Sequence, residues 1–155
     1  MARVALHLLW ACILVSWRLP FLTLAQRQAC IKQWSQQLLS ILGVSLHVRG
    51  NTMAQGPALL VCNHISWLDI FVLYAVGHCR FVSKADVQRW PVIGRLTQGV
   101  GTLFIERNAR RDAMRVVHQM AEQLTAGDVL AVFPEGTTSD GSTVLPFHAN
   151  LLQAA

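Results

Sequence analysis

The chain has 155 residues, which fits one domain, and 53% of them are hydrophobic while only 14% are charged, against about 25% charged in a typical soluble domain. This composition, with a mean hydropathy of +0.39, excludes an intrinsically disordered chain and argues against a surface wholly exposed to water. The net charge of +5 lies entirely in residues 1–68, which contain no acidic residue. The Lys and Arg residues form no basic run, so the excess favours an anionic membrane surface over nucleic acid.

The N-terminal segment from Val4 to Trp17 is almost continuously apolar. As a helix it would reach only about 21 Å, against about 30 Å for the hydrocarbon core of a bilayer. Extending it to Ala25 would place Arg18 and Pro20 near the middle of the span, which is costly. From Gln26 to Leu42, apolar residues recur at helical spacing opposite basic and amide side chains.

Two helices joined around Pro20 predict an interfacial, monotopic membrane anchor formed by residues 1–42. Two alternatives stay open. A cleaved signal peptide would use Arg3 as its basic start but would have a poor cleavage site at residues 23–25. A single tilted membrane span would also account for the apolar segment.

Residues 43–155 alternate short strand-like runs with helical stretches, which predicts an α/β domain with a largely parallel sheet flanked by helices. The expected strands are rich in Val, Ile, Leu and Phe: Val44–Val48, Ala58–Cys62, Arg80–Ser83, Thr102–Glu106 and Val129–Phe133. The expected helices are Trp67–Val76, Ala109–Leu124 and a shorter one within Val87–Gly99. In such sheets the functional residues lie at the carboxyl ends of the strands, and the polar clusters of this chain follow the expected strands at these ends.

The four cysteines, Cys12, Cys30, Cys62 and Cys79, are widely spaced. They form no CxxC pair and no other metal-ligand spacing, so neither a zinc site nor a redox motif is predicted. We expect four reduced, mostly buried thiols in a cytosolic setting.

The first polar cluster, Asn63–Asp69, directly follows the expected strand Ala58–Cys62. If a helix begins near Ser66, the side chains of His64 and Asp69 can face each other. A carboxylate bonded to one imidazole nitrogen would fix the tautomer and leave the other nitrogen as a proton acceptor. The same residues also fit a capping box variant, Ser66-x-x-Asp69, with His64 as an ordinary turn residue. The spacing alone leaves both interpretations open.

The second cluster is Gly101–Arg107, in which a glycine opens the expected strand Thr102–Glu106 and an arginine follows it. A guanidinium at the end of a strand can hold a phosphate group through two hydrogen bonds. Taken alone, a solvated surface arginine is the simpler interpretation.

The third cluster is Phe133–Ser139, where an expected strand runs into Pro-Glu-Gly and three consecutive hydroxyl residues. The glycine permits a close backbone approach or a positive φ, and the hydroxyl and exposed N–H groups can receive phosphate or headgroup oxygens. A polar turn with an N-cap fits the same residues equally well.

Together and in this order, the three clusters resemble the glycerophospholipid acyltransferase family, in particular the bacterial 1-acylglycerol-3-phosphate acyltransferases. The signature of that family reads N-H-x4-D, then G-x-x-F-I-x-R, then F-P-E-G-T-x-S. This chain has Asn63-His64-x4-Asp69, Gly101-x-x-Phe104-Ile105-x-Arg107 and Phe133-Pro134-Glu135-Gly136-Thr137-x-Ser139. The resemblance covers residues 44–152 and includes Phe81–Lys84, which looks like a recurring stretch of the family.

The resemblance implies a role for each matching residue. His64 would be the general base that takes the proton from the hydroxyl of the acceptor, and Asp69 would orient and stabilise it. The remaining residues would form the acceptor site: Gly101, Phe104 and Arg107 around the phosphate, Glu135, Gly136 and Thr137 shaping the same site, and Lys84 as a second cation. No metal ligand is implied.

The implied activity is acyl transfer from a thioester of coenzyme A or acyl carrier protein to the free hydroxyl of a lysophospholipid, without a covalent acyl-enzyme. The thioester is a co-substrate, and no cofactor is expected. The default acceptor is 1-acylglycerol-3-phosphate, giving phosphatidic acid, while a related branch acylates lyso-ornithine lipid, so the acceptor stays open. Membrane lipids are expected partners and nucleic acid is not. The expected location is the cytoplasmic face of the inner (plasma) membrane, as a peripheral or monotopic protein.

Two other classes of function stay open. One is a non-catalytic lipid-binding or membrane-scaffolding protein of the same fold. The other is a hydrolase that uses Ser66 or a cysteine with His64, although the chain lacks the G-x-S-x-G elbow.

The family usually has a fourth motif, a proline-centred apolar strand well downstream of the third, and this chain ends before it, at Ala155. We therefore expect the acyltransferase domain, residues 43–155, to be incomplete at its C-terminus and to expose a sheet edge. A chain of this length is expected to be poorly soluble and weakly active or inactive.

Overall fold

The computed structural model describes residues 2–50, 56–105 and 110–155, with side chains in the helix over 110–125 described from residue 114 onward. The elements in chain order are α1 (Ala2–Ile13), a π-helical turn (Leu14–Arg18), a 3₁₀ turn (Leu19–Phe21), α2 (Leu24–Ile41), β1 (Ala58–Val61), α3 (Leu68–Val76), β2 (Arg80–Lys84), α4 (Ala85–Gln88), α5 (Ile93–Gly99), β3 (Leu103–Ile105), α6 (Arg110–Thr125), β4 (Val129–Val132) and a final 3₁₀ helix (Ala149–Ala154).

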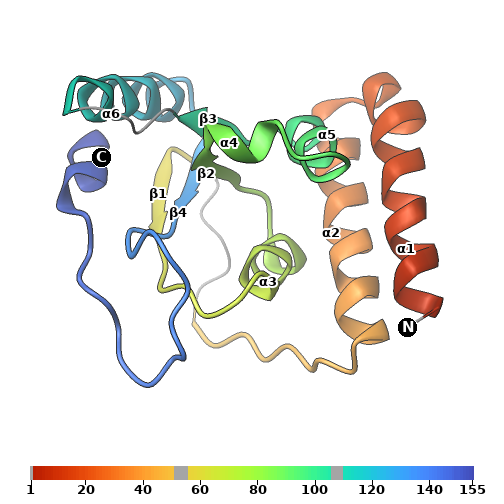
Figure 1. Cartoon of the computed structure of the whole chain (residues 1–155). Coiled ribbons are helices and arrows are strands. Elements are labelled where there is room, and N and C mark those ends of the chain that lie inside the picture. Colours follow the sequence, from red (N-terminus) through yellow and green to blue (C-terminus); the bar gives the residue numbers. More distant parts are fainter. Residues whose placement is uncertain (1, 51–55, 106–109) are drawn as a thin grey trace.

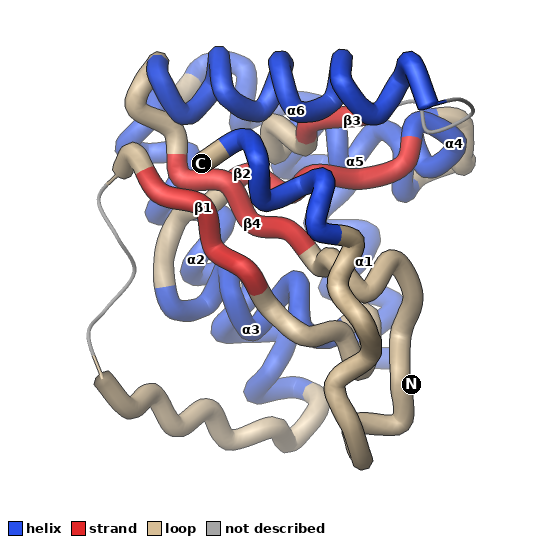
Figure 2. The backbone as a smooth tube through the Cα atoms, turned by 90° about the vertical axis from the view of Figure 1, so that its left-hand side faces the viewer, coloured by secondary structure: helices blue, strands red, loops and turns tan. Residues whose placement is uncertain are grey.

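The centre of the fold is a four-stranded sheet in the order β1-β4-β2-β3, with every strand parallel to its neighbour (Figure 2). β1 pairs with β4 from Ala58 opposite Val129 to Val61 opposite Val132. The predicted α/β class, with a parallel sheet flanked by helices, is confirmed. Because all strands run the same way, their carboxyl ends meet at one edge of the sheet and their amino ends at the other.

One of the five expected strands is wrong. Val44–Val48 forms no strand, and all five of its residues are exposed. The helix before it is followed by a left-handed Gly43, with φ +73°. A strand requires a hydrogen-bonded neighbour, and this segment pairs with none of the four strands. An alternating apolar pattern in a short segment does not show whether that segment pairs with the sheet.

The two faces of the sheet are covered by different helices (Figure 1). On one face, α6 and the final 3₁₀ helix bury Ile105, Met120, Leu130, Val132 and Leu151. On the other face, α3 packs on the sheet around Tyr74, Cys79, Phe81 and Ala131. Each strand therefore alternates between the two cores, as a strand buried on both faces must.

The N-terminal helices α1 and α2 run side by side (Figure 1) and are joined by a reciprocal contact between His7 and Trp34. The imidazole nitrogen Nε2 of His7 lies 3.0 Å from the carbonyl oxygen of Trp34, the indole N–H of Trp34 donates to the carbonyl oxygen of His7 at 3.2 Å, and the rings stack. α2 in turn packs on α3, where the side-chain amide of Gln36 donates to the carbonyl of Ala75.

Two N-terminal helices are thus present, but they differ in character. In the described part of the chain, one helix is long and apolar enough to cross a membrane, and it covers Ala2–Phe21. α2 is amphipathic and buries Leu38 and Leu39. Thr23 and Gln26 form a capping box at its start, with both reciprocal hydrogen bonds present. The structure therefore has one apolar N-terminal helix, followed by an amphipathic one.

Met120 lies at the centre of the α6 face, with no exposed surface. We expect Met120→Ala to lower the free energy of unfolding by about 2–5 kcal/mol, because it removes buried methylenes and leaves a cavity. The matched control is Met114→Ala on the same helix, where the side chain is 66% exposed and the expected change is below about 0.5 kcal/mol. Chemical denaturation of both variants in detergent measures the difference, and equal losses would contradict the observed packing.

Candidate active site

The first polar cluster lies in the loop that carries the chain from β1 into α3. In this loop the Nδ1 atom of His64 lies 2.9 Å from Oδ2 of Asp69. Both side chains are only partly exposed, at 18% and 25%. The predicted meeting of imidazole and carboxylate is therefore present in the geometry.

The carboxylate of Asp69 also organises the loop itself. The same oxygen, Oδ2, accepts hydrogen bonds from the backbone N–H groups of Ile65 at 2.8 Å and Ser66 at 2.9 Å. Partial burial alone would raise the pKa of Asp69, but the N–H groups of Ser66 and Ile65 and the ring of His64 together lower it. Asp69 is therefore ionised at neutral pH. The sequence left open whether Asp69 bonds to the start of the helix or to His64, and in the structure the same carboxylate does both.

The ionised carboxylate determines the tautomer of His64. An anion can only accept, so Nδ1 carries the proton and donates it to Asp69. Nε2 then keeps its lone pair, and no described residue forms a hydrogen bond with it. The arrangement can remove a proton from a hydroxyl group placed against Nε2.

The ring of His64 rests on an aromatic platform. Phe133, the residue after β4, stacks on the imidazole with 4.0 Å between ring centroids and 14° between ring planes. Phe81 stacks beneath Phe133 at 5.7 Å, and Tyr74 meets Phe81 edge-on. This stack fixes the ring plane of His64, and its electron-rich faces suit an imidazolium that forms during proton transfer.

Glu135 connects the histidine loop to the segment after β4. Its side chain is 95% buried, leaving 5% exposed. Oε2 accepts the backbone N–H of His64 at 2.6 Å, and Oε1 accepts the backbone N–H of Leu145 at 2.9 Å. Glu135 was predicted to shape the acceptor site. In the structure both carboxylate oxygens are used to hold backbone, which positions His64.

Gly136 and Ser139 continue this connection. Gly136 has a left-handed φ of +71° and donates its N–H to the carbonyl of Phe133, which turns the chain sharply at the end of β4. Ser139 then donates its backbone N–H to the carbonyl of His64 at 2.8 Å. Thr137, between them, is exposed. The loop after β4 thus lies beside the loop after β1 (Figure 1).

The other predicted acceptor residues lie in different places. Lys84 is the exposed last residue of β2, at the carboxyl edge that also carries His64. Phe104 is in β3 opposite Ser83, and alternation with the buried Ile105 places it on the α3 face of the sheet. Arg107 lies outside the described residues, and its predicted role stays a prediction.

Gly101 does not reach the His64–Asp69 pair. It precedes β3, at the amino edge of the sheet, and has a left-handed φ of +82°. Its carbonyl accepts a hydrogen bond from Nε of Arg80 at 2.8 Å. The strand β3 separates the first and last residues of the second motif, so Gly101 lies at the sheet edge opposite His64. This placement does not support a contact between Gly101 and the acceptor.

The structure adds residues that sequence reasoning gave no role. Phe133 belongs to the quoted third motif, so the signal was present, but a motif does not reveal ring stacking. Ser139 was one of the hydroxyl residues expected to receive phosphate or headgroup oxygens, and in the structure its backbone N–H donates to the carbonyl of His64. Leu145, which donates to Glu135, carries no signal in the sequence because it acts through its backbone N–H.

The geometry does not favour a serine or cysteine nucleophile at this position. The hydroxyl oxygen of Ser66 accepts the backbone N–H of Leu68 at 3.0 Å and is not bonded to His64. Burial, and next the charge of Asp69, raise the pKa of the Cys62 thiol, which keeps it protonated. Among the described residues, no group of three or more His, Cys, Asp or Glu side chains is placed to hold a metal ion.

Comparison with known protein families identifies the family to which the chain belongs. The model of the family described as Acyltransferase matches residues 43–155, most of the chain. The chain belongs to the acyltransferase family. The resemblance predicted from the three motifs is confirmed, and the first and third of these motifs form and brace the His64–Asp69 pair.

Two curated relatives of this chain illustrate the similarity. A lyso-ornithine lipid O-acyltransferase from Rhizobium meliloti (strain 1021) is 36% identical over 155 residues, which is 100% of this chain and 52% of the relative. A 1-acyl-sn-glycerol-3-phosphate acyltransferase from Neisseria meningitidis serogroup B is 38% identical over 131 residues, covering 83% of this chain and 51% of the relative. The chain therefore spans about half the length of these relatives.

A solved structure shares the fold. The crystal structure of the 1-acyl-sn-glycerophosphate acyltransferase PlsC from Thermotoga maritima matches with a TM-score of 0.71 at 20% identity, covering 99% of this chain and 68% of that one. At this identity the likeness establishes the architecture: a parallel sheet between helices.

The lowered pKa of Asp69 makes a prediction about stability and pH. A carboxyl whose pKa is lower in the folded chain stabilises the fold above its unfolded pKa, and this contribution is lost as the pH falls through the folded value. We expect Asp69→Asn to unfold at a lower temperature than the parent at neutral pH, with the difference shrinking in acid. Thermal unfolding across this pH range measures it, with the exposed Asp86→Asn as control. A deficit in Asp69→Asn that is independent of pH would contradict the assignment.

The two backbone contacts of Glu135 make a second prediction. A glutamine there keeps one acceptor oxygen, but its amide group cannot accept the other backbone N–H. We expect Glu135→Gln to lower the free energy of unfolding by about 1–3 kcal/mol, the cost of a buried unsatisfied donor. Glu122→Gln, at an exposed carboxylate on α6, is the matched control, with an expected change within about 0.5 kcal/mol. Equal stability of Glu135→Gln and Glu122→Gln in denaturant titrations would refute the bracing role.

Proposed function

We propose that this chain carries the catalytic machinery of a lysophospholipid O-acyltransferase, which moves an acyl group from a thioester to a free hydroxyl. The observation that carries the proposal is the 2.9 Å contact of Asp69 with Nδ1 of His64, which leaves Nε2 as the base. A hydroxyl-bearing acceptor needs a base of this kind, and the geometry at Ser66 and Cys62 argues for direct transfer without an acyl-enzyme.

In the proposed reaction, the imidazole of His64 takes up one proton and later returns it. Nε2 of His64 takes the hydroxyl proton as the acceptor oxygen attacks the thioester carbonyl, and the carbon–sulfur bond breaks to release the thiol group of the donor. The imidazolium returns its proton to the departing sulfur, so the base is restored. Asp69 and the Phe133 ring stabilise the charged imidazolium between these two steps.

The acceptor is proposed from the relatives. Those named above act on 1-acyl-sn-glycerol-3-phosphate or on lyso-ornithine lipid, and they match this chain to a similar degree. We take 1-acylglycerol-3-phosphate as the leading acceptor, giving phosphatidic acid, and lyso-ornithine lipid as the alternative. Lys84, at the same sheet edge as His64, and Arg107 are the proposed cations for an anionic headgroup. The proposed donor is acyl-coenzyme A or acyl carrier protein, with no further cofactor.

We also propose that the enzyme works at the cytoplasmic face of the membrane, as a peripheral or monotopic protein. The support is the apolar helix α1, on which Leu6, Leu9 and Trp10 are exposed at 66%, 58% and 43%. Large apolar side chains exposed along one helix would be costly in water and suit a lipid interface. A membrane location also brings the domain to a lysolipid acceptor.

The base assignment is tested in the protein produced from its complete reading frame. We expect His64→Ala to lower the rate of acyl transfer about 10²–10⁴-fold, the usual contribution of a general base, while sedimentation with vesicles is unchanged. His118→Ala, at an exposed histidine on α6, is the matched control and keeps the parental rate. Product formation from radiolabelled acyl donor with each lysolipid is the measurement.

Three results would decide between the candidates. Transfer to 1-acylglycerol-3-phosphate or to lyso-ornithine lipid identifies the acceptor. Parental rates in His64→Ala would overturn the base assignment. Binding of lysolipid with no transfer to either acceptor would favour a non-catalytic lipid-binding protein.

A further inference from the structure

The connection between α4 and α5 presents consecutive apolar side chains to solvent. Residues 89–95, which we call the Trp90 turn, read Arg-Trp-Pro-Val-Ile-Gly-Arg. The side chains of Trp90, Val92 and Ile93 are 56%, 57% and 44% exposed. Tryptophan is usually well covered in a folded chain, and neighbouring large apolar residues at the surface mark a place of contact with a partner or a lipid. The turn is therefore a candidate interaction surface.

Two exposed arginines, Arg89 and Arg95, flank these apolar residues, and residues 87–105 contain no acidic residue. The three ion pairs among the described residues involve neither arginine. An acidic protein would complement the arginines alone, whereas the boundary of a bilayer also accepts the apolar side chains between them. There an indole lies among the headgroups and guanidinium groups reach the lipid phosphates. The charge of the turn is complementary to an anionic membrane.

The backbone of the turn is tight. Val92 has a φ of +66° and a ψ of −60°, and the N–H of Ile93 donates to the carbonyl of Pro91 at 2.7 Å. This γ-turn is strained, above all for a β-branched residue. Strain of this kind persists where the surrounding structure maintains it, often at binding sites. Gly94 follows in a buried position, where a Cβ atom would lie 2.1 Å from the carbonyl oxygen of Gln88.

The Trp90 turn lies at the same edge of the sheet as the candidate active site. It follows α4, which begins directly after β2, so it is at the carboxyl edge that also carries His64. In Figure 2 the carboxyl ends of β2 and β4, α4 and the start of α1 all lie toward the right of the molecule. Trp67, in the loop of His64, is also exposed. A bilayer against the turn would therefore lie on the side from which a lysolipid has to reach the base.

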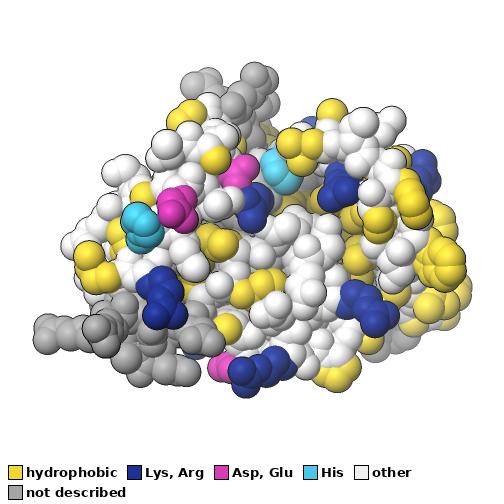
Figure 3. Space-filling view, turned by 90° about the horizontal axis from the view of Figure 1, so that it is seen from above, with side chains coloured by type: hydrophobic (Ala, Val, Ile, Leu, Met, Phe, Trp, Pro, Cys, Tyr) yellow, Lys and Arg dark blue, Asp and Glu magenta, His cyan; other side chains and the backbone are white. Residues whose placement is uncertain are grey.

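The turn is fixed relative to the apolar helix α1. α5 packs against the π-helical turn after α1, and a Cβ atom on Gly99 would lie 2.3 Å from Cγ1 of Val15. Large exposed side chains recur along α1 at helical spacing: Leu6, Leu9, Trp10 and Ile13. Figure 3, seen from above, shows hydrophobic side chains gathered along the side formed by the N-terminal helices. The domain thus carries two apolar surfaces held together by close packing.

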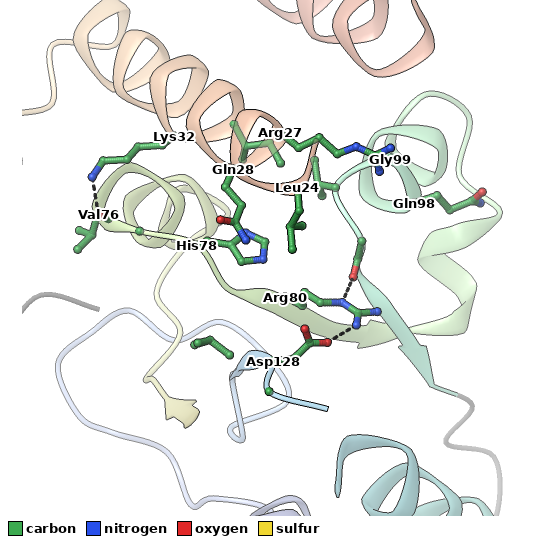
Figure 4. A pocket seen from close by; sticks show the side chains of 16 residues that line it. Leu24, Arg27, Gln28, Lys32, Val76, His78, Arg80, Gln98, Gly99 and Asp128 are labelled. Atoms are coloured by element: carbon green, nitrogen blue, oxygen red, sulfur yellow. Dashed lines mark hydrogen bonds and ion pairs between the residues drawn. The ribbon is translucent and has the colours of Figure 1, made fainter. Parts of the chain in front are cut away.

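The cations at the opposite, amino edge of the sheet have partners within the chain. Arg80 is bonded to Asp128 and to the carbonyl of Gly101, and Lys32 donates to the carbonyl of Val76 (Figure 4). The contacts of Arg80 join the residues at the amino ends of β2, β3 and β4, which is a structural role. The carboxyl edge is therefore the edge that we orient toward lipid.

We propose that the Trp90 turn is a second membrane-contact site, which binds a bilayer containing anionic phospholipid and directs the carboxyl edge of the sheet toward it. Trp90 and Val92 enter the interface, and Arg89 and Arg95 lie at the level of the lipid phosphates. α1 is the first contact, and the two contacts together fix the orientation of the domain. The inference rests on the proposed membrane location, because it takes α1 to contact lipid as well.

The experiment measures lipid contact at single side chains by NMR. The protein is produced from its complete reading frame and placed in bicelles of phosphatidylcholine and phosphatidylglycerol, and Trp→Phe variants assign the indole N–H signals. A phospholipid with a nitroxide on its acyl chain broadens the signals of side chains that touch the bilayer. We expect it to broaden the indole signals of Trp10 and Trp90 and to leave the methyl signal of Met114, exposed on α6, unchanged.

Two variants test the chemistry of the turn. Arg89→Gln removes one charge, and we expect it to raise about fivefold the concentration of phosphatidylglycerol that gives half of the maximal broadening of Trp90. Arg115→Gln, at an exposed arginine of α6, is the matched control and is expected to behave like the parent. Val92→Gly removes an apolar side chain where glycine adopts a positive φ without strain, so the fold is retained and the broadening of Trp90 falls.

The outcomes are distinct and do not depend on the acyl-transfer assay. Broadening of Trp10 without Trp90 would overturn the second contact and leave the contact of α1 intact. Broadening of neither would contradict the proposed membrane location, and the second contact with it. Equal broadening of Met114, or an equal effect of Arg115→Gln, would also overturn the site. A shift of the Trp90 signal by acyl carrier protein, without broadening by the nitroxide lipid, would assign the turn to an acidic protein instead.

Discussion

The contact between Asp69 and His64 is the interaction on which the candidate active site depends. It joins two side chains five positions apart, in a loop that a parallel strand leaves and a helix enters. The carboxylate has two functions, because the oxygen that meets the imidazole also accepts two backbone N–H groups. Loss of Asp69 would therefore disturb both the tautomer of His64 and the loop that carries it.

Other parts of the chain hold this pair from outside. Phe133 supports the ring plane, Glu135 holds the backbone N–H of His64, and Ser139 donates to its carbonyl. All three come from the loop after β4, the strand that pairs with β1. The third motif of the family thus positions the first, and the parallel pairing of two strands brings them together.

Much of this arrangement could be predicted from the sequence. Four strands and the main helices were predicted because runs such as Val129–Val132 are fully apolar and bounded by turn residues. The His64–Asp69 pair was predictable because both residues lie in one local loop. The predicted strand Val44–Val48 was wrong because strand pairing depends on contacts distant in the sequence, which an alternating apolar pattern does not reveal. The prediction assigned Gly101 to the acceptor site because a motif does not show at which end of a strand each of its residues lies.

The direct measurement is the tautomer and protonation state of His64, from ¹⁵N–¹H correlations across its imidazole ring at neutral pH. The geometry requires a proton on Nδ1, facing the Asp69 carboxylate, and an unprotonated Nε2 that can act as a base. A neutral ring with its proton on Nε2 would leave no base facing the acceptor and would contradict both the geometry and the proposed acyl transfer.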